Sequence, residues 1–357
     1  NTGDAILLNG RDAYTGDITL NITGGTITST NAYALRDYKA ADQAHKTSLV
    51  AISGGEFRGG AGKEAVTFSD ETKALAWTDT TGLKITNGLY NIDPAAFVFS
   101  PLRTYVTGSG MYGIQAIPPI LNVELNIEYF ELQTAVDAAT AGNTLKFQLD
   151  YTIPATVTIN KALTLNTNGK TISRTAAFTP DSANNSILVS PGGDVTITGG
   201  GTITATSGTA IRIEGNETTL AKVTLVDATL YAPSFSVAIL GNRTYNTHDT
   251  AYLSQFVMTG GYTNETVILE GNGAEAEING GKLTGWAPIM GNGTVDAVNN
   301  KNEGGTKITI GGSAVIDGTT GTPSIAIFHP QDGLLTINGG TIIGTNGIEM
   351  DAGDLVI

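Results

Sequence analysis

The chain has 357 residues and no cysteine, so disulfides, thiolate metal sites and cysteine nucleophiles are excluded. It carries 33 acidic and 19 basic residues, and the formal net charge of −14 would repel nucleic acid and anionic membrane surfaces. The 46 glycines and the many Thr, Asn and Ile residues predict β-structure with tight turns, and no apolar run is long enough to span a bilayer.

The N-terminal part contains short strand-like segments, which we call phrases, and each ends in a Gly or Asn-Gly turn. We expect residues 1–116 to form the C-terminal part of one stack of such strands. The chain begins at Asn1 without a signal peptide and stops within a phrase at LVI, so we expect a fragment of a longer protein. The clearest phrases are AILLNG (5–10), DITLNITGG (17–25), LVAISGG (49–55) and LKITNG (83–88).

Two prolines interrupt this pattern. The two prolines of the segment IPPI (117–120) lack a backbone N–H and resist both helix and central strand, so residues 117–128 are predicted to be a linker. A fresh series of strands begins beyond it. Residues 129–357 are therefore predicted to form a second stack, truncated at its C-terminal end.

One amphipathic segment precedes the second stack. Leu132, Val136 and Ala139 recur at helical spacing, and Gly142 supplies a stop signal. These residues predict a short capping helix near residues 129–141. Such a helix would cover the open end of a stack of strands, where unpaired edges invite aggregation.

Three kinds of phrase recur along the second stack. A cycle holds a first phrase such as DVTITGG (194–200), a short middle phrase such as TIIGTNG (341–347) and a third phrase such as AIRIEGN (210–216). Like phrases would pair if the chain coils, because each then lies about 4.8 Å from its equivalent one turn later. The pattern predicts an all-β, right-handed parallel β-helix with three strands per coil. We expect positive φ at the turn glycines Gly199 and Gly280.

Two longer segments resemble parts of a known group of proteins. ELQTAVDAATAGNTLKFQLDYTIPATVTINKALTLNTNGKTI (131–172) is similar to the capping helix and opening coils of large cell-surface proteins of gut Firmicutes and their relatives. LYNIDPAAFVFSPLRTYVTGSGMYGIQ (89–115) resembles their closing module. The two matches cover about 70 residues. The resemblance implies a pectate-lyase-like β-helix in a secreted bacterial protein that is often attached to the cell wall and described as an adhesin.

A catalytic constellation is not apparent in the repeats. Glycoside hydrolysis needs two carboxylates about 5–10 Å apart. Lyase chemistry usually needs an Arg or Lys base beside a Ca²⁺ that is held by several acids. Arg212 lies beside Glu214, but no neighbouring rung repeats the acids. We therefore predict no catalytic residue and no metal ligand, and whether the chain is an enzyme stays open with a non-catalytic role favoured. Glu270, Glu275 and Glu277 lie close together and leave a Ca²⁺ site as an alternative without a supporting motif.

The longest insertions follow the third phrase and should leave each stack along one edge. They comprise residues 36–47, 69–82, 242–254 and 292–305; the first and third contain His45 and His248, the second contains Trp77, and His329 follows a later third phrase. Loops on one edge of a solenoid are often its binding surface, whereas tolerated insertions are the alternative. The predicted ligand-binding residues are Tyr245, His248, Asp249, Tyr252, Asp296 and Asn300.

These observations predict a non-catalytic, extracellular stalk or adhesin on a bacterial cell surface. Its loops would bind a host or cell-wall glycan or a surface protein, with no nucleic-acid partner and no membrane insertion. The alternative is a carbohydrate-active enzyme, a polysaccharide lyase or glycoside hydrolase, or a decayed relative that still binds glycan. Trp286 and Tyr262, near middle phrases, are candidates for stacking on sugars, and the alternative is that each packs to close a rung. A phage tailspike is a third alternative, although its trimer interface would need apolar outward rows.

Overall fold

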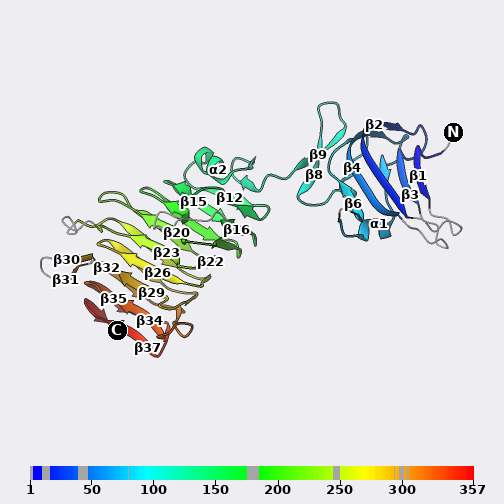
Figure 1. The fold of residues 1–357 in the computed structure, drawn as a ribbon. Helices are drawn as coiled ribbons and strands as arrows, with labels where there is room; N and C mark the ends of the chain where they lie inside the picture. Colours follow the sequence, from blue (N-terminus) through cyan, green and yellow to red (C-terminus); the bar gives the residue numbers. More distant parts are fainter. Residues whose placement is uncertain are drawn as a thin grey trace. The chain divides into compact units, whose positions relative to one another are not determined.

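The computed structural model describes residues 3–9, 17–38, 47–78, 80–174, 185–243, 250–292, 294–296, 301–303 and 305–357. The chain divides into two compact units, Asn1–Ile117 and Pro118–Ile357, which we call the first and second units. Both consist mainly of β-strands (Figure 1). The all-β prediction is confirmed.

Each coil of the second unit contributes one strand to each of three sheets, which we call C, D and E. Sheet C contains the first phrases. From β12 onwards its neighbouring strands are parallel. Its strands are β12 (Asn143–Phe147), β15 (Ala162–Asn166), β18 (Asp194–Thr198), β21 (Ala221–Leu225), β24 (Ser254–Met258), β27 (Ala274–Ile278), β32 (Thr306–Ile310), β35 (Gly333–Ile337) and β38 (Asp354–Val356).

Sheets D and E contain the middle and third phrases. Sheet D comprises β13 (Tyr151–Thr152), β16 (Thr171–Arg174), β19 (Thr202–Ala205), β22 (Thr229–Tyr231), β25 (Tyr262–Thr263), β28 (Lys282–Thr284), β33 (Val315–Asp317) and β36 (Thr341–Ile343). Sheet E comprises β14 (Val157–Ile159), β17 (Asn185–Val189), β20 (Thr209–Glu214), β23 (Phe235–Leu240), β26 (Thr266–Glu270), β29 (Ile289–Asn292), β34 (Ile325–His329) and β37 (Asn346–Met350). The predicted parallel β-helix with three strands per coil is confirmed.

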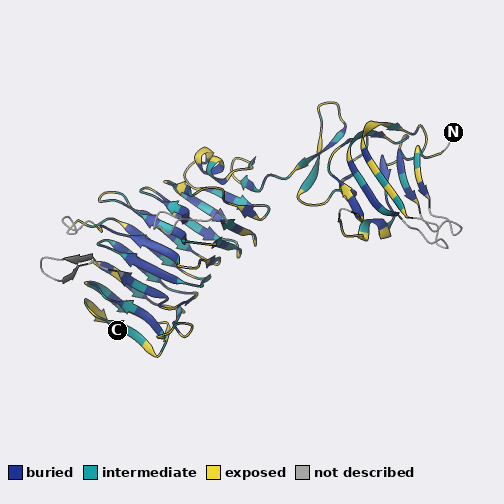
Figure 2. Ribbon diagram, in the orientation of Figure 1, coloured by how far each residue is buried: buried dark blue, intermediate teal, exposed yellow. Residues whose placement is uncertain are grey.

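The strands of the second unit are rich in buried residues (Figure 2), and their inward-facing side chains form the columns of its core. Strand alternation places every second residue inside, and the parallel register puts equivalent residues on top of one another. Burial of each large apolar side chain stabilises the fold by about 1.5–3 kcal/mol. One buried column in sheet C runs through Leu163, Val195, Val223, Phe256, Ala276, Ile308 and Leu335.

A hairpin and a helix close the N-terminal end of the second unit. β10 (Ile120–Asn122) pairs antiparallel with both β11 (Ile127–Tyr129) and β12, so most of residues 117–128 belong to this fold rather than to a linker. The predicted capping helix is α2 (Leu132–Ala138). It ends four residues before Gly142, where Ala139 is already extended, and Lys161 on the next coil caps this end by donating to the carbonyls of Val136, Asp137 and Ala139 at 3.0–3.3 Å.

The first unit is built from the same kinds of short strand and glycine turn as the second, in fewer coils. Sheet A is parallel and sheet B begins parallel, but β2 and β4 each run through a glycine bend and so combine a first and a middle phrase. Sheet A comprises β1 (Ile6–Asn9), β3 (Leu35–Tyr38) and β5 (Val66–Thr67). Sheet B comprises β2 (Ile18–Thr28), β4 (Thr47–Arg58), β6 (Gly82–Ile85), β7 (Leu89–Tyr90), β9 (Tyr112–Ala116) and β8 (Leu102–Val106).

The first unit also contains two short helical segments that were not predicted. α1 (Asp70–Ala74) begins after Ser69, whose side chain accepts from the Thr72 amide, and η1 (Ala95–Phe97) is a single 3₁₀ turn. Ser69 followed by two acids is the usual signal for a helix N-terminus and identifies α1 in retrospect. No helix in the described part of the chain is long and apolar enough to cross a membrane.

The turn glycines do not all have the predicted conformation. Gly199 has the expected positive φ of +98°. The prediction is wrong for Gly280, because the left-handed conformation falls on its neighbour Gly281, at φ +80°. Gly280 is instead required by close packing, since a Cβ there would lie 2.3 Å from the carbonyl oxygen of Thr259.

Candidate functional site

The insertions of the second unit leave at the corner where strands of sheet E end and strands of sheet C begin, which we call the E–C edge. Residues 242–254 connect β23 to β24, and residues 292–305 connect β29 to β32. The second insertion contains the antiparallel pair β30 (Thr294–Asp296) and β31 (Lys301–Glu303). Both insertions therefore leave from one edge of the second unit, as the repeat pattern predicted.

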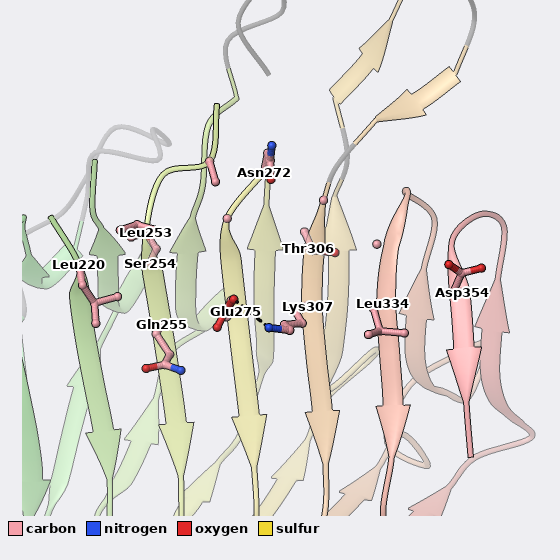
Figure 3. A pocket seen from close by; sticks show the side chains of 14 residues that line it. Leu220, Leu253, Ser254, Gln255, Asn272, Glu275, Thr306, Lys307, Leu334 and Asp354 are labelled. Carbon is pink, nitrogen blue, oxygen red and sulfur yellow. Dashed lines mark hydrogen bonds and ion pairs between the residues drawn. The ribbon is translucent and has the colours of Figure 1, made fainter. Parts of the chain in front are cut away.

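A groove of about 680 Å³ lies along this edge, at the bases of both insertions (Figure 3). It extends from the residue before β21 to β38, which is five strand spacings or about 24 Å. Its length follows the solenoid axis. The lining residues are Leu220, Ala251, Leu253, Ser254, Gln255, Asn272, Gly273, Glu275, Gly305, Thr306, Lys307, Gly333, Leu334 and Asp354.

The floor of the groove is one outward-facing row of sheet C. The parallel register aligns Gln255, Glu275, Lys307, Leu334 and Asp354 on successive strands. Figure 3 shows the side chains of Glu275 and Lys307 pointing toward each other across neighbouring strands, with 3.4 Å between Oε1 and Nζ. Both side chains are about half exposed (41% and 56%), so solvent screens this ion pair and leaves it free to exchange partners.

Buried hydrogen bonds fix the rim beside the first insertion. The Ser254 hydroxyl donates to the carbonyl of Leu240 at 2.5 Å and accepts from the Gly215 amide at 2.8 Å. Asn242 and Asn272 exchange backbone hydrogen bonds, and the Asn242 side chain donates to the carbonyl of Thr250. The base of the insertion is therefore held rigidly against the neighbouring coil.

Exposed apolar groups complete the groove. Leu220 and Leu253 are exposed at one end, and Leu334 is half-buried in the floor row. The lining thus combines apolar contacts with the Gln255 amide and charged groups, which is typical of ligand sites that recognise polar molecules.

The outer face of sheet E differs from this open face. Ala238 and Ile268 alternate with core residues and point outward, yet Ile268 is only 2% exposed. Together with Leu240 they form a separate buried cluster, against which Phe235 and Met290 pack. The apolar runs in FSVAIL and TVILE are typical of strands covered on both faces. The sheet C side of the edge is therefore the more accessible one.

The structure places only part of the predicted ligand-binding set. Tyr252 is half-buried at the base of the first insertion, and its amide donates to the carbonyl of Asn272 at 3.0 Å. Asp296 lies in β30, although its side chain falls outside the described residues. Tyr245, His248, Asp249 and Asn300 also lie outside the described residues. Sequence reasoning missed Gln255, Lys307 and Asp354, because only the register shows that they share a row.

The carboxylates of the groove are not arranged for hydrolysis. Glu275 and Asp354 are three strands apart, which places their backbones about 14 Å from each other and beyond the 5–10 Å of glycosidases. Glu277 is closer to Glu275 but lies outside the groove lining, and it accepts from the Asn279 side chain at 2.6 Å.

The three glutamates considered for Ca²⁺ have protein partners. Glu270 pairs with Arg243 at 2.9 Å, and Glu275 pairs with Lys307. Among the described residues there is no group of three or more His, Asp or Glu side chains arranged to hold a metal ion.

The other residues singled out in the sequence lie elsewhere. His329 is fully buried at the end of β34, with Nδ1 3.1 Å from the carbonyl oxygen of Ala352, and so belongs to the core rather than to a binding edge. Arg212 pairs with Glu214 at 2.9 Å. Trp286 is exposed beyond β28, and the Tyr262 hydroxyl lies 2.7 Å from that of Thr284.

Two carboxyl groups near sheet D have pKa values displaced in opposite directions. The Lys282 ammonium, 2.8 Å away, and hydrogen bonds from Thr319 lower the pKa of Asp317 to about 2. Burial raises the pKa of Glu265, which follows β25. β25 and β33 are two strand spacings apart, about 10 Å. Asp317 is occupied by Lys282, so its low pKa is that of a structural ion pair.

Comparison with known proteins adds no assignment: no family model, no curated protein and no solved structure matches this chain.

Proposed function

We propose that this chain is a rigid, non-catalytic segment of an extracellular bacterial surface protein, and that the groove at the E–C edge binds a linear glycan. The single observation that supports it most is the elongated groove along the edge from which both insertions of the second unit leave. The proposed location outside a bacterial cell rests on the resemblance of residues 89–115 and 131–172 to surface proteins.

The dimensions and chemistry of the groove favour a chain-like ligand. The site is about 24 Å long, and its floor is a single row of outward-facing side chains. This shape suits several successive sugar units better than one compact metabolite. The amide of Gln255 and the carboxylate of Asp354 offer hydrogen bonds, while Leu253 offers an apolar contact. The coiled scaffold holds these groups in place, so little ordering entropy is lost on binding.

The test is a glycan array followed by titration calorimetry with the full chain. Lys307→Glu places a like charge beside Glu275 in the floor of the groove and should weaken binding of the best glycan about tenfold or more. Lys222→Glu makes the same change in the same outward row but outside the groove lining, and should leave binding unchanged. Equal binding by both variants would show that this groove is not the site.

The first insertion is tested separately. Replacing residues 244–249 by Gly-Asn retains Tyr252 and the Asn242 to Thr250 hydrogen bond, so the rim should still form. Loss of glycan binding with an unchanged thermal midpoint assigns part of the ligand contact to the insertion. Unchanged binding assigns recognition to the groove floor alone.

A carbohydrate-active enzyme is the second candidate, because Glu265 follows β25 and Asp317 lies in β33, two strand spacings or about 10 Å apart, close to the carboxyl separation of inverting glycosidases. Burial raises the pKa of Glu265, as expected of a proton donor, whereas Asp317 would first have to leave its ion pair with Lys282. Incubation with acidic and neutral polysaccharides, followed by reducing-end and 4,5-unsaturation assays, separates the candidates. We expect no product. Turnover that is abolished by Asp317→Asn or Glu265→Gln would replace the binding proposal by the enzymatic one.

A further inference from the structure

The last parallel rung of the first unit is covered over only half of its length. β4 pairs with β6 through residues 49–52 and with β7 through residues 56–57. The closing hairpin of β8 and β9 continues the sheet beyond β7, where Tyr90 pairs with Tyr112. β6 pairs with β4 alone, and no other strand in the described part of the chain lies on its second edge.

A groove of about 480 Å³ lies against β6. Its floor includes Leu83 and Ile85, which face the core, as well as Lys84, which faces solvent. A cavity that touches residues from both faces of a strand runs along the backbone edge of that strand, where alternate N–H and C=O groups point away from β4. Residues 73–77 form one wall and residues 99–102 form the other.

Both walls are preformed. Gly82 has φ +105°, and a Cβ there would lie 2.6 Å from the carbonyl oxygen of Ala76, so the segment that holds Trp77 packs closely on the start of β6. The Thr78 amide closes this segment by donating to the carbonyl of Thr81 at 2.8 Å. In the opposite wall, the Leu102 amide donates to the carbonyl of Phe99 at 3.0 Å, and the Phe99 side chain is 51% exposed.

The groove is basic in an acidic chain. Lys73 and Lys84 are the charged residues of its lining, which contains no Asp or Glu. Lys84 Nζ lies 4.7 Å from the centroid of the Trp77 ring, and Lys84 makes no ion pair with any described residue. Lys73 pairs with the exposed Asp70 outside the lining, at 2.6 Å. A ligand with negative charge therefore complements this groove.

We propose that the groove beside β6 binds an extended acidic peptide segment of a partner protein, which adds to β6 as the next strand. The open edge supplies main-chain hydrogen bonds, Trp77 and Phe99 contact every second side chain, and Lys84 meets the acidic residues between them. This site lies in the first unit and does not depend on the glycan proposal for the second unit. A saccharide would not need the unpaired strand edge.

The test uses the fluorescence of Trp77. The chain has two tryptophans, so Trp286→Phe leaves Trp77 as the only one. The probe is a capped synthetic heptapeptide in which Glu and Val alternate, and we expect saturable changes in Trp77 emission. The matched peptides carry Lys in place of Glu, or N-methyl groups along the edge that would pair with β6. Both should bind about tenfold more weakly or not at all.

Two charge reversals in the Trp286→Phe chain complete the test. Lys84→Glu changes an exposed side chain of the groove and should weaken binding of the acidic peptide about tenfold. Lys63→Glu changes a lysine of the same unit outside the lining and should have no effect. Equal binding of the acidic, basic and N-methylated peptides would overturn the proposal. So would saturation of Trp77 by oligogalacturonate but not by the acidic peptide.

Discussion

In the first unit the stack ends under a hairpin that pairs with β7 but leaves the edge of β6 open, whereas the second unit begins under a hairpin and a helix together. There β10 pairs along β12, and α2 packs on β10, β11 and β14. The unpaired strand edges are therefore covered more completely at the start of the second unit than at the end of the first. The incompletely covered end is the one that carries a peptide-sized groove.

The cores of the two units differ in a related way. In the first unit Phe57 stacks on Tyr90 with ring centroids 5.0 Å apart, beside the last rung. In the second unit Phe147 and Tyr151 lie in the first coil, and the columns behind them are mostly aliphatic, with Phe256 as an exception. β-Branched side chains stack well at the strand spacing, while rings fill the space where the repeat stops.

The largest expected effect tests whether the units unfold separately. Phe57→Ala removes a fully buried ring from the first unit and should destabilise that unit by about 3–5 kcal/mol. Calorimetry should then show one transition moved to lower temperature and the other unchanged. Phe256→Ala is the counterpart and should move the second transition. A common shift of both transitions in either variant would contradict the division into two units.

A smaller effect separates the two reasons for glycine in the turns. Gly199→Ala and Gly280→Ala should each cost about 1–3 kcal/mol in chemical denaturation, the first through positive φ and a clash with Asn166, the second through the clash with Thr259 alone. Gly24→Ala in the first unit meets neither obstacle and should stay within about 0.5 kcal/mol of the parent. A neutral Gly280→Ala variant would show that the backbone at Thr259, just beyond β24, can move away.

The cap of the second unit is tested at Lys161. Lys161→Met removes an ammonium that donates to three carbonyls at the end of α2 and should destabilise the second unit by about 1–2 kcal/mol. Hydrogen exchange should show faster opening of α2, with little change in the first unit. Lys146→Met, on the outer face of β12, is the matched control and should leave α2 unaffected.

The smallest expected effect is a pH dependence confined to the second unit. The pKa of Asp317 is about 2 in the folded chain against an ordinary 3.8, so its ion pair stabilises the fold above pH 3.8 and loses this contribution as the pH falls toward 2. Lys282 is about half exposed, so solvent screens the ion pair and keeps its contribution to stability small. Asp317→Asn should therefore be slightly less stable than the parent at pH 7, and the difference should shrink as the pH falls from 3.8 through 2. A constant difference across this range would exclude ionisation as its cause.

Much of this architecture is readable in the sequence because its signals are local. The phrase DVTITGG predicts β18 and its turn, and the equivalent phrases predict the other strands of sheet C. The C-terminal end of α2 was less predictable, because the group that caps its last carbonyls, the Lys161 ammonium, comes from a coil more than 20 residues later. The strands on either side of residues 123–126 were hidden by the two prolines, although Asn126 at φ +53° closes a hairpin turn there.

The sequence by itself determined the repeat, the three-sided coil and the edge from which the long insertions leave, because each depends on residue spacing within one coil. Only the tertiary structure decided which side chains share a groove. Glu275, Lys307 and Asp354 come from different coils with insertions of different lengths between them, so hydrogen-bonded register alone brings them into one row. The residues of β6 likewise do not show that its second edge is open, because this depends on where the hairpin of residues 102–116 stops pairing.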